Sequence, residues 1–199
     1  MIFMRQAEIS RNTAETQILV NLSLDGSGQA EVQTDIGFFD HMLNHLARHG
    51  GFDLRVNAQG DLHIDGHHTV EDVGICLGRA FSQALGEPRG IARYGYAVTP
   101  MDEALAEAAV DVSGRPYLHF GAALPRTAVG GFDAELTEEF FRAFAMNARL
   151  TVHLGLRYGE NAHHCVEALF KACARALRAA VARDAREESV PSTKGQLDI

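Results

Sequence analysis

Two histidine-rich patterns carry most of the chemistry that this sequence of 199 residues offers. The pattern His-His-x-x-Glu occurs twice, at His67, His68 and Glu71 and again at His163, His164 and Glu167. On a helix, residues i and i+4 share a face, while residue i+1 is turned away by about 100°. The first His and the Glu of each copy can therefore hold one cation together, while the second His points elsewhere. Two copies predict two metal ions, each bound by the His/Glu pair of one copy and the second His of the other, within one subunit or between subunits.

The type of ligand narrows the kind of metal. Imidazole and carboxylate groups without thiolates suit manganese, iron, zinc or nickel, and they exclude a cysteine-type structural zinc site. The alternative reading is a helix start whose glutamate only complements the helix dipole. That reading can explain one copy of the pattern, but the recurrence at matching places favours metal binding.

Further histidines lie outside the two patterns. His41, His45 and His49 recur every four residues, so they lie along one face of a helix. We expect His41 to be a metal ligand and His45 and His49 to line the site. In the second half of the chain, Glu139 takes the place of His41. The remaining three histidines have apolar neighbours in strand-like segments and are expected to be packing residues of the fold: His63, His119 and His153. The three cysteines fall on amphipathic helical segments and are expected to be buried: Cys76, Cys165 and Cys173.

The elements that position these residues follow from apolar periodicity. In the first half, strands are expected at 18–24, 29–35 and 52–58 and helices at 38–49 and 67–85, with 18–24 and 29–35 forming a hairpin around Asp25 and Gly26. In the second half, strands are expected at 93–99, 105–112, 117–122 and 150–156 and helices at 136–148 and 162–181. Residues 67–80 align with 163–176 with six identities in 14 positions.

These observations predict an α+β fold built by tandem duplication of a strand–strand–helix–strand–helix unit. The halves, residues 1–90 and 91–182, are expected to pack with pseudo-twofold symmetry into one catalytic domain. Residues 183–199 are expected to be a mobile C-terminal tail. Two unrelated α+β halves are the alternative, which the repeated His-His-x-x-Glu pattern disfavours.

Composition excludes several classes of protein. The net charge of −8 argues against nucleic-acid binding, because no basic stripe is available to neutralise phosphates. The sequence also lacks a run of 18 apolar residues, which a membrane-spanning helix would need. Three cysteines do not make a disulfide framework, and the first residues do not read as a secretory signal. A reducing cytoplasm is therefore the expected location.

Several segments together resemble the imidazoleglycerol-phosphate dehydratase family. They are FFDHMLNHLARHG, DGHHTVEDVGICLG, GIARYGYAVTPMDEALAEAAVDVSGRPYL, GENAHHCVEALFKACARALR and STKG. The match runs in order from about Arg11 to Gly195 and leaves no room for a fused phosphatase domain, so a monofunctional form is expected. The resemblance implies ribosomal-protein-S5-domain-2-like halves, a homo-oligomer of 24 subunits built from trimers, and two manganese ions per site at subunit interfaces.

The resemblance also implies roles for individual residues. One manganese ion would be held by His41, His68, His163 and Glu167. The other would be held by His67, Glu71, His164 and residue 139, where many members have a histidine and this chain has Glu139. Glu15, in the RNTAET segment, would contact the substrate near its reacting carbons. Substrate binding, mostly around the phosphate, would fall to Arg93, Arg115, Lys171, Ser192, Thr193 and Lys194.

The implied reaction is the dehydration of D-erythro-imidazole glycerol phosphate to imidazole acetol phosphate in histidine biosynthesis. It would proceed by metal-assisted elimination through an imidazolate-type intermediate, with Glu15 moving the proton. Two other functions use the same residues. A dinuclear metallohydrolase could act on a small phosphate ester, or metals could join the subunits of a non-enzymatic shell.

Overall fold

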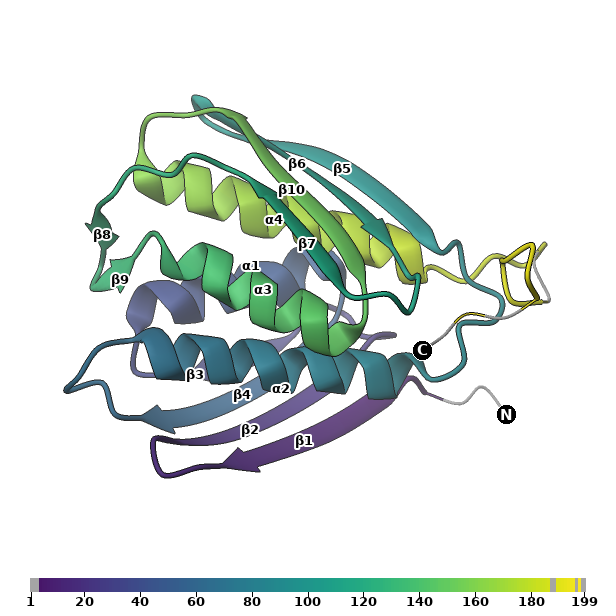
Figure 1. Ribbon diagram of the computed structural model, residues 1–199, viewed down its shortest axis with the longest axis horizontal. Helices are drawn as coiled ribbons and strands as arrows, with labels where there is room; N and C mark the ends of the chain where they lie inside the picture. Colours follow the sequence, from purple (N-terminus) through teal and green to yellow (C-terminus); the bar gives the residue numbers. More distant parts are fainter. Residues whose placement is uncertain (1–3, 187–188, 196, 198–199) are drawn as a thin grey trace.

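Two four-stranded sheets enclose a layer of four helices in the computed structural model, which describes residues 4–186, 189–195 and 197 (Figure 1). The first half contains β1 (Gln6–Asn12), β2 (Thr16–Ser23), β3 (Ala30–Gln33), α1 (Gly37–Gly50), β4 (Asp53–Gly60) and α2 (His67–Leu85). The second half contains β5 (Tyr94–Met101), β6 (Ala104–Asp111), β7 (Tyr117–Gly121), β8 (Ala128–Val129), β9 (Phe132–Asp133), α3 (Leu136–Ala148), β10 (Thr151–Tyr158) and α4 (Ala162–Val181).

The two halves have the same topology. The first sheet has the order β1-β2-β4-β3, and the second has the matching order β5-β6-β10-β7. The α+β class and the duplication are thus confirmed. Each half has one more strand before its first helix than the expected unit, and the second half adds the short β8–β9 hairpin.

One expected strand pairing is wrong. Residues 29–35 were expected to return along 18–24 as a hairpin, but β3 pairs in parallel with β4, and the antiparallel partners of β2 are β1 and β4. The physical reason is the connection through α1. A helical crossover joins parallel strands, whereas a two-residue turn joins antiparallel ones. Sequence alternation predicts a strand at this place without showing which neighbour it joins.

The helices pack across the boundary between the halves. Helix α2 covers the first sheet and packs against α3 of the second half, while α4 covers the second sheet and packs against α1 of the first half. Their apolar faces form one continuous core, which contains the phenylalanine cluster of Phe39, Phe140, Phe141, Phe144 and Phe170. This exchange brings α1, with its histidine stripe, alongside the start of α4.

The three histidines expected to be packing residues are exposed. His119 and His153 lie side by side on the outer face of the second sheet, with ring centroids 5.3 Å apart. His63 lies in an exposed turn before α2. Alternation along a strand places every second residue outward, whatever its neighbours. The burial of the three cysteines is confirmed, and all are free thiols. Within the described part of the chain, no helix is long and apolar enough to span a bilayer.

Close contact between α2 and α3 depends on glycine. A Cβ added at Gly78 would lie 2.6 Å from the backbone oxygen of Phe144 and 2.9 Å from the nitrogen of Ala148. Gly74, one turn earlier, would clash with the backbone oxygen of Phe140 at 2.8 Å. Backbone atoms of a packed helix cannot move aside as a flexible side chain can, so the two helices would have to separate.

We expect Gly78→Ala to lower the free energy of unfolding by about 1–3 kcal/mol through overpacking, despite the helix-forming advantage of alanine. Gly37→Ala is the matched control because nothing lies within 4 Å of its added Cβ. Its unfolding free energy should change by less than about 0.5 kcal/mol. Chemical denaturation of both variants measures this, and equal stability of the two would contradict the packing argument.

Candidate metal and substrate site

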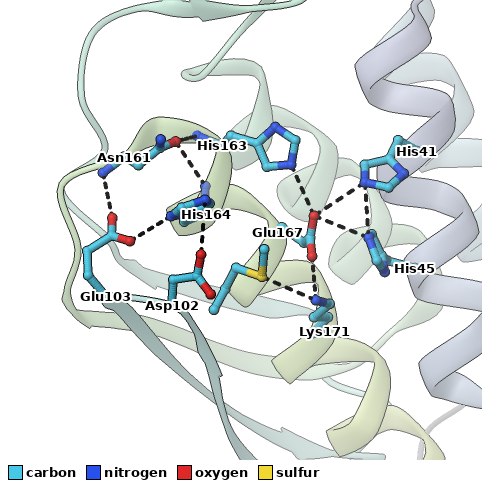
Figure 2. A network of polar contacts seen from close by, with 10 residues as sticks. His41, His45, Asp102, Glu103, Asn161, His163, His164, Glu167 and Lys171 are labelled. Carbon is cyan, nitrogen blue, oxygen red and sulfur yellow. Dashed lines mark hydrogen bonds and ion pairs between the residues drawn. The ribbon is translucent and has the colours of Figure 1, made fainter.

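Three side chains from two halves of the chain converge on one point (Figure 2). His41 Nε2 and His45 Nε2 each lie 3.3 Å from Glu167 Oε2, and 3.2 Å from each other. The centre of such a triangle lies at the edge length divided by √3, about 1.9 Å from each atom, close to the ~2.0–2.2 Å of a nitrogen or carboxylate bond to a divalent metal. The donors therefore fit a metal ion in both type and spacing.

Glu167 is the centre of this group, and its carboxylate is buried, with 3% of the residue exposed. His163, one turn earlier on α4, places Nε2 3.1 Å from Glu167 Oε2, and Lys171, one turn later, donates to Oε1. Burial by itself would raise the pKa of Glu167. The hydrogen bond and charge of Lys171, together with the hydrogen bond from His163, outweigh it and lower this pKa to about 2. The carboxylate is thus held ionised, as a metal ligand must be.

Two histidines of α1, His45 and His49, have lowered pKa values that favour the neutral form. Burial lowers the pKa of His45 to about 4, and burial with the charges of Lys171 and Arg175 also lowers that of His49. A neutral imidazole has a nitrogen lone pair to offer a metal. The two rings stack on each other, with centroids 5.4 Å apart.

At the start of α4, His164 turns away from Glu167, as the helical phase predicts. The side chain of Asn161 caps the helix by accepting from the backbone nitrogens of His163 and His164. His164 Nδ1 lies 2.6 Å from Glu103 Oε2, in the β5–β6 turn. Backbone donation from Asn161 and the contact with His164 lower the pKa of Glu103 to about 2, and the same contact raises the pKa of His164.

The start of α2 has a similar arrangement. The carboxylate of Asp65 accepts from the backbone nitrogen of His67. His68 Nδ1 lies 3.0 Å from Asp61 Oδ2, which raises the pKa of His68, and 3.9 Å from Glu15 Oε2. The turn between β1 and β2 thus brings Glu15 next to the first His-His pattern.

That turn is anchored by a carboxylate on α2. Buried Asp72 accepts from Arg11 Nε at 2.8 Å and from Thr16 Oγ1 at 2.5 Å, at the two ends of the turn. Thr13 Oγ1 in turn accepts from the backbone nitrogens of Glu15 and Thr16. The backbone of Glu15 is therefore held in place, while its side chain remains 56% exposed.

A single chain assembles only part of the two expected metal sites. Among residues 4–186, 189–195 and 197, the one group of three or more His, Cys or carboxylate ligand atoms within 4.8 Å is that of His41, His45 and Glu167. His68 and His164 lie apart from this group, each against a different carboxylate. His67, Glu71 and Glu139 are partly buried, and none of them joins this group.

A basic groove lies at the other end of the molecule. It has a volume of about 810 Å³ and is lined by Arg93, Arg115, Lys194 and the tail residues 189–193, a size within the usual range for small-molecule sites. Arg93 donates to Asp111 at 2.8 and 3.2 Å and to the backbone oxygen of Pro191 at 2.7 Å. Asp111 also lies 3.8 Å from Arg115.

The basic groove and the histidines lie near opposite ends of helix α4, so the length of this helix gives the distance between them. The backbone nitrogen of Arg93 donates to the oxygen of Ala180, near the end of α4, whereas His163 lies at its start. Seventeen residues of helix span about 26 Å. Figure 1 shows the same arrangement, with the starts of α2 and α4 at the left end and the tail at the right. No small phosphorylated molecule bridges that distance within one chain.

Four carboxylates of the site were missed by the sequence reasoning: Asp61, Asp72, Glu103 and Asp111. Three of them, Asp72, Glu103 and Asp111, belong to the motif segments that carry the family resemblance. Their partners are 7 to 61 residues away along the chain. A carboxylate pattern could have marked them as candidates, but only the fold shows which basic group each one meets.

The helical layer lies between duplicated sheets, the spacing of the His/Glu group suits a metal ion, and the separate basic groove suits a small anion. The imidazoleglycerol-phosphate dehydratase family profile matches residues 34–177. Imidazoleglycerol-phosphate dehydratase of Gluconobacter oxydans is 59% identical over 97% of this chain and 98% of its own length. That of Symbiobacterium thermophilum is 61% identical over 97% and 93%.

Solved structures of the same family have a similar fold. The Staphylococcus aureus imidazoleglycerol-phosphate dehydratase has a TM-score of 0.81 and 43% identity, covering 89% of this chain and 99% of its own. The Pyrococcus furiosus enzyme, solved with (S)-C348, has a TM-score of 0.81 and 39% identity, covering 95% and 100%. The chain belongs to the imidazoleglycerol-phosphate dehydratase family, and it is a hydro-lyase.

We expect Glu167→Gln to weaken divalent-metal binding at least tenfold because the ionised oxygen shared by His41 and His45 is lost. Glu8→Gln, on exposed β1, removes the same charge away from the histidines and should bind metal as the unaltered protein does. Titration calorimetry with Mn²⁺ measures both. Undiminished binding by Glu167→Gln would show that this carboxylate is not a ligand.

Proposed function

We propose that this chain removes water from D-erythro-imidazole glycerol phosphate to give imidazole acetol phosphate, the dehydration step of histidine biosynthesis. The observation that supports it best is the convergence of histidines from both halves on buried Glu167, in a chain of this family. The three free, buried cysteines agree with a reducing cytoplasm as its place of action.

Two manganese ions per active site are part of the proposal. One would be held by His41, His68, His163 and Glu167, and the other by His67, Glu71, His164 and Glu139. His45 and His49 line the site, and the spacing of His45 also suits a ligand. Nitrogen and carboxylate oxygen donors suit Mn²⁺. When bound, such ions would supply Lewis-acid polarisation of the imidazole ring and of the substrate hydroxyls.

Glu15 is proposed to move the proton. The reaction expels hydroxide from the carbon next to the imidazole, with electron density supplied by the imidazolate form of the ring, and breaks the C–H bond of the neighbouring carbinol carbon, whose proton passes to the base. The enol that results then tautomerises to the ketone of the acetol phosphate. A base for this step must be positioned yet able to reach the substrate. The turn of Glu15 is anchored through Asp72, and its side chain is free of hydrogen bonds among the described residues.

The basic groove is proposed to hold the phosphate. Arg93, Arg115 and Lys194 bring three positive charges against the one negative charge of Asp111, so a dianion is attracted despite the acidity of the whole chain. Ser192 and Thr193 add hydroxyl and backbone donors from the 183–199 tail, whose residues Pro191 and Ser189 are already tied to Arg93 and Gly90. Lys171 would complete substrate binding at the metal end.

An active site of this kind needs more than one subunit. Because the groove and the histidines lie about 26 Å apart along α4, the phosphate end of one chain must meet the metal end of another. This supports a homo-oligomer whose sites lie at interfaces between subunits. We propose an assembly of 24 subunits built from trimers, with residues 1–90 and 91–182 as its repeated halves.

We expect metal-loaded protein to convert the substrate to the acetol phosphate, detected by mass spectrometry and phosphate assay. Glu15→Gln should retain substrate binding and lose at least a hundredfold in kcat, since general-base catalysis contributes about 10²–10⁴. Glu8→Gln serves as the control. Release of inorganic phosphate would support the metallohydrolase instead, and full activity of Glu15→Gln would remove the proposed base.

Complementation tests the shared active site. Arg115→Ala and Glu167→Gln should each be inactive, because each removes one end of every site. When the two chains are co-expressed, random assembly pairs an intact groove with an intact metal end in about a quarter of the sites, so about a quarter of the activity should return. Recovery no greater than that of each variant alone would place the whole site within one chain.

A further inference from the structure

The second histidine of each His-His pattern is held in the same way, by a carboxylate at Nδ1. His68 Nδ1 lies 3.0 and 3.2 Å from the oxygens of Asp61, and His164 Nδ1 lies 2.6 Å from Glu103. The other ring nitrogen of each histidine, Nε2, has fewer partners. His68 Nε2 has no hydrogen bond or ion pair among the described residues, and His164 Nε2 lies 3.7 Å from Asp102, beyond hydrogen-bond distance (Figure 2).

We infer that Asp61 and Glu103 are positioning residues, which hold His68 and His164 with Nε2 directed outward to bind a metal ion. This inference rests on the proposed metal-dependent function. A carboxylate only accepts, so Nδ1 must carry the proton, and in the neutral ring the lone pair is then on Nε2. The contact also fixes the plane of each ring, as a second layer of groups around a metal commonly does.

Each carboxylate is itself held in place. Glu103 Oε1 accepts from the backbone nitrogens of Glu160 and Asn161 at 3.3 and 2.8 Å, so it ties the β5–β6 turn to the start of α4. Asp61 follows β4 directly, and its side chain is 14% exposed. Neither carboxylate needs to reorder when a metal arrives, because each already faces its histidine.

The two halves orient the second histidine with carboxylates from different elements, and this difference affects the position of Glu15. Glu15 and Glu103 occupy equivalent places, the turn between the first two strands of their halves. In the second half the turn carboxylate orients the histidine. In the first half Asp61 does so, and Glu15 stays 3.9 Å away and largely exposed. Asp61 thereby leaves Glu15 available for the proton.

The test compares Asp61→Asn and Glu103→Gln by Mn²⁺ titration calorimetry on the full chain. Each amide keeps the shape of the side chain but can donate to Nδ1, which moves the proton to Nε2 and blocks it. We expect each variant to weaken one of the two Mn²⁺ sites by about 10–100-fold and to leave the other unchanged. Asp61→Glu, which restores a carboxylate, should recover part of the lost affinity.

Nitrogen-15 NMR of histidine in the metal-free chain gives a second readout. At a pH above the pKa values of both rings, the Nδ1–H form should dominate at His68 and His164 in the unaltered protein and decline in the matching variant. Glu160→Gln, exposed and next to Asn161, controls for the loss of charge alone. Unchanged Mn²⁺ affinity in both amide variants would overturn the inference. A failure of the unaltered protein to bind Mn²⁺ would instead overturn the proposed function.

Discussion

The packing of each half's first helix against the last helix of the other half is the constraint on which the remaining features depend. Because α1 lies against α4, His41 and His45 reach Glu167 from across the duplication boundary. The parallel contact between α2 and α3 is close enough that Gly74 and Gly78 have no room for a side chain. The apolar faces thus do more than stabilise the fold. They set the distance at which the histidines meet a carboxylate.

The groups around the buried carboxylate of Glu167 determine its protonation state. An isolated buried glutamate would hold its proton, but Lys171 and the hydrogen bond from His163 keep Glu167 ionised. The positive charge beside the carboxylate also keeps the buried group compensated, since an unpaired buried charge is strongly destabilising. The same neighbours that stabilise the folded chain therefore prepare the site for a cation.

Duplication placed a His-His-x-x-Glu pattern at the start of a helix in each half, and the two halves hold this pattern with different residues. Both halves have a carboxylate in the turn between their first two strands. In one half it contacts a histidine, while in the other Asp61 takes over that contact. At the far end of α4, a few Arg and Lys side chains around Asp111 create a basic groove in an acidic protein. Its distance from the histidines explains why the chain is proposed to work only as part of an oligomer.

Much of the molecule could be predicted from sequence because it depends on local periodicity. The spacing of apolar residues located α2, α3 and α4 at their observed bounds, and helical phase separated His163 and Glu167 from His164. The pairing of β3 with β4 could not be predicted, since alternation does not name a partner strand. The exposure of His119 and His153 was missed because apolar neighbours do not show which face of a strand is covered.

By itself, then, the sequence determined the types of the candidate ligands, their position along each helix and, through its motifs, the family. Only the tertiary structure decided which groups meet. Asp61, Asp72, Glu103 and Asp111 each contact a partner through the fold, and the groove and the histidines lie at opposite ends of one helix. The physical reason is the separation along the chain between the residues that interact. Periodicity reports on neighbours within a turn or two, whereas a metal or phosphate site is built by contacts between distant segments, which depend on how the helices and sheets pack.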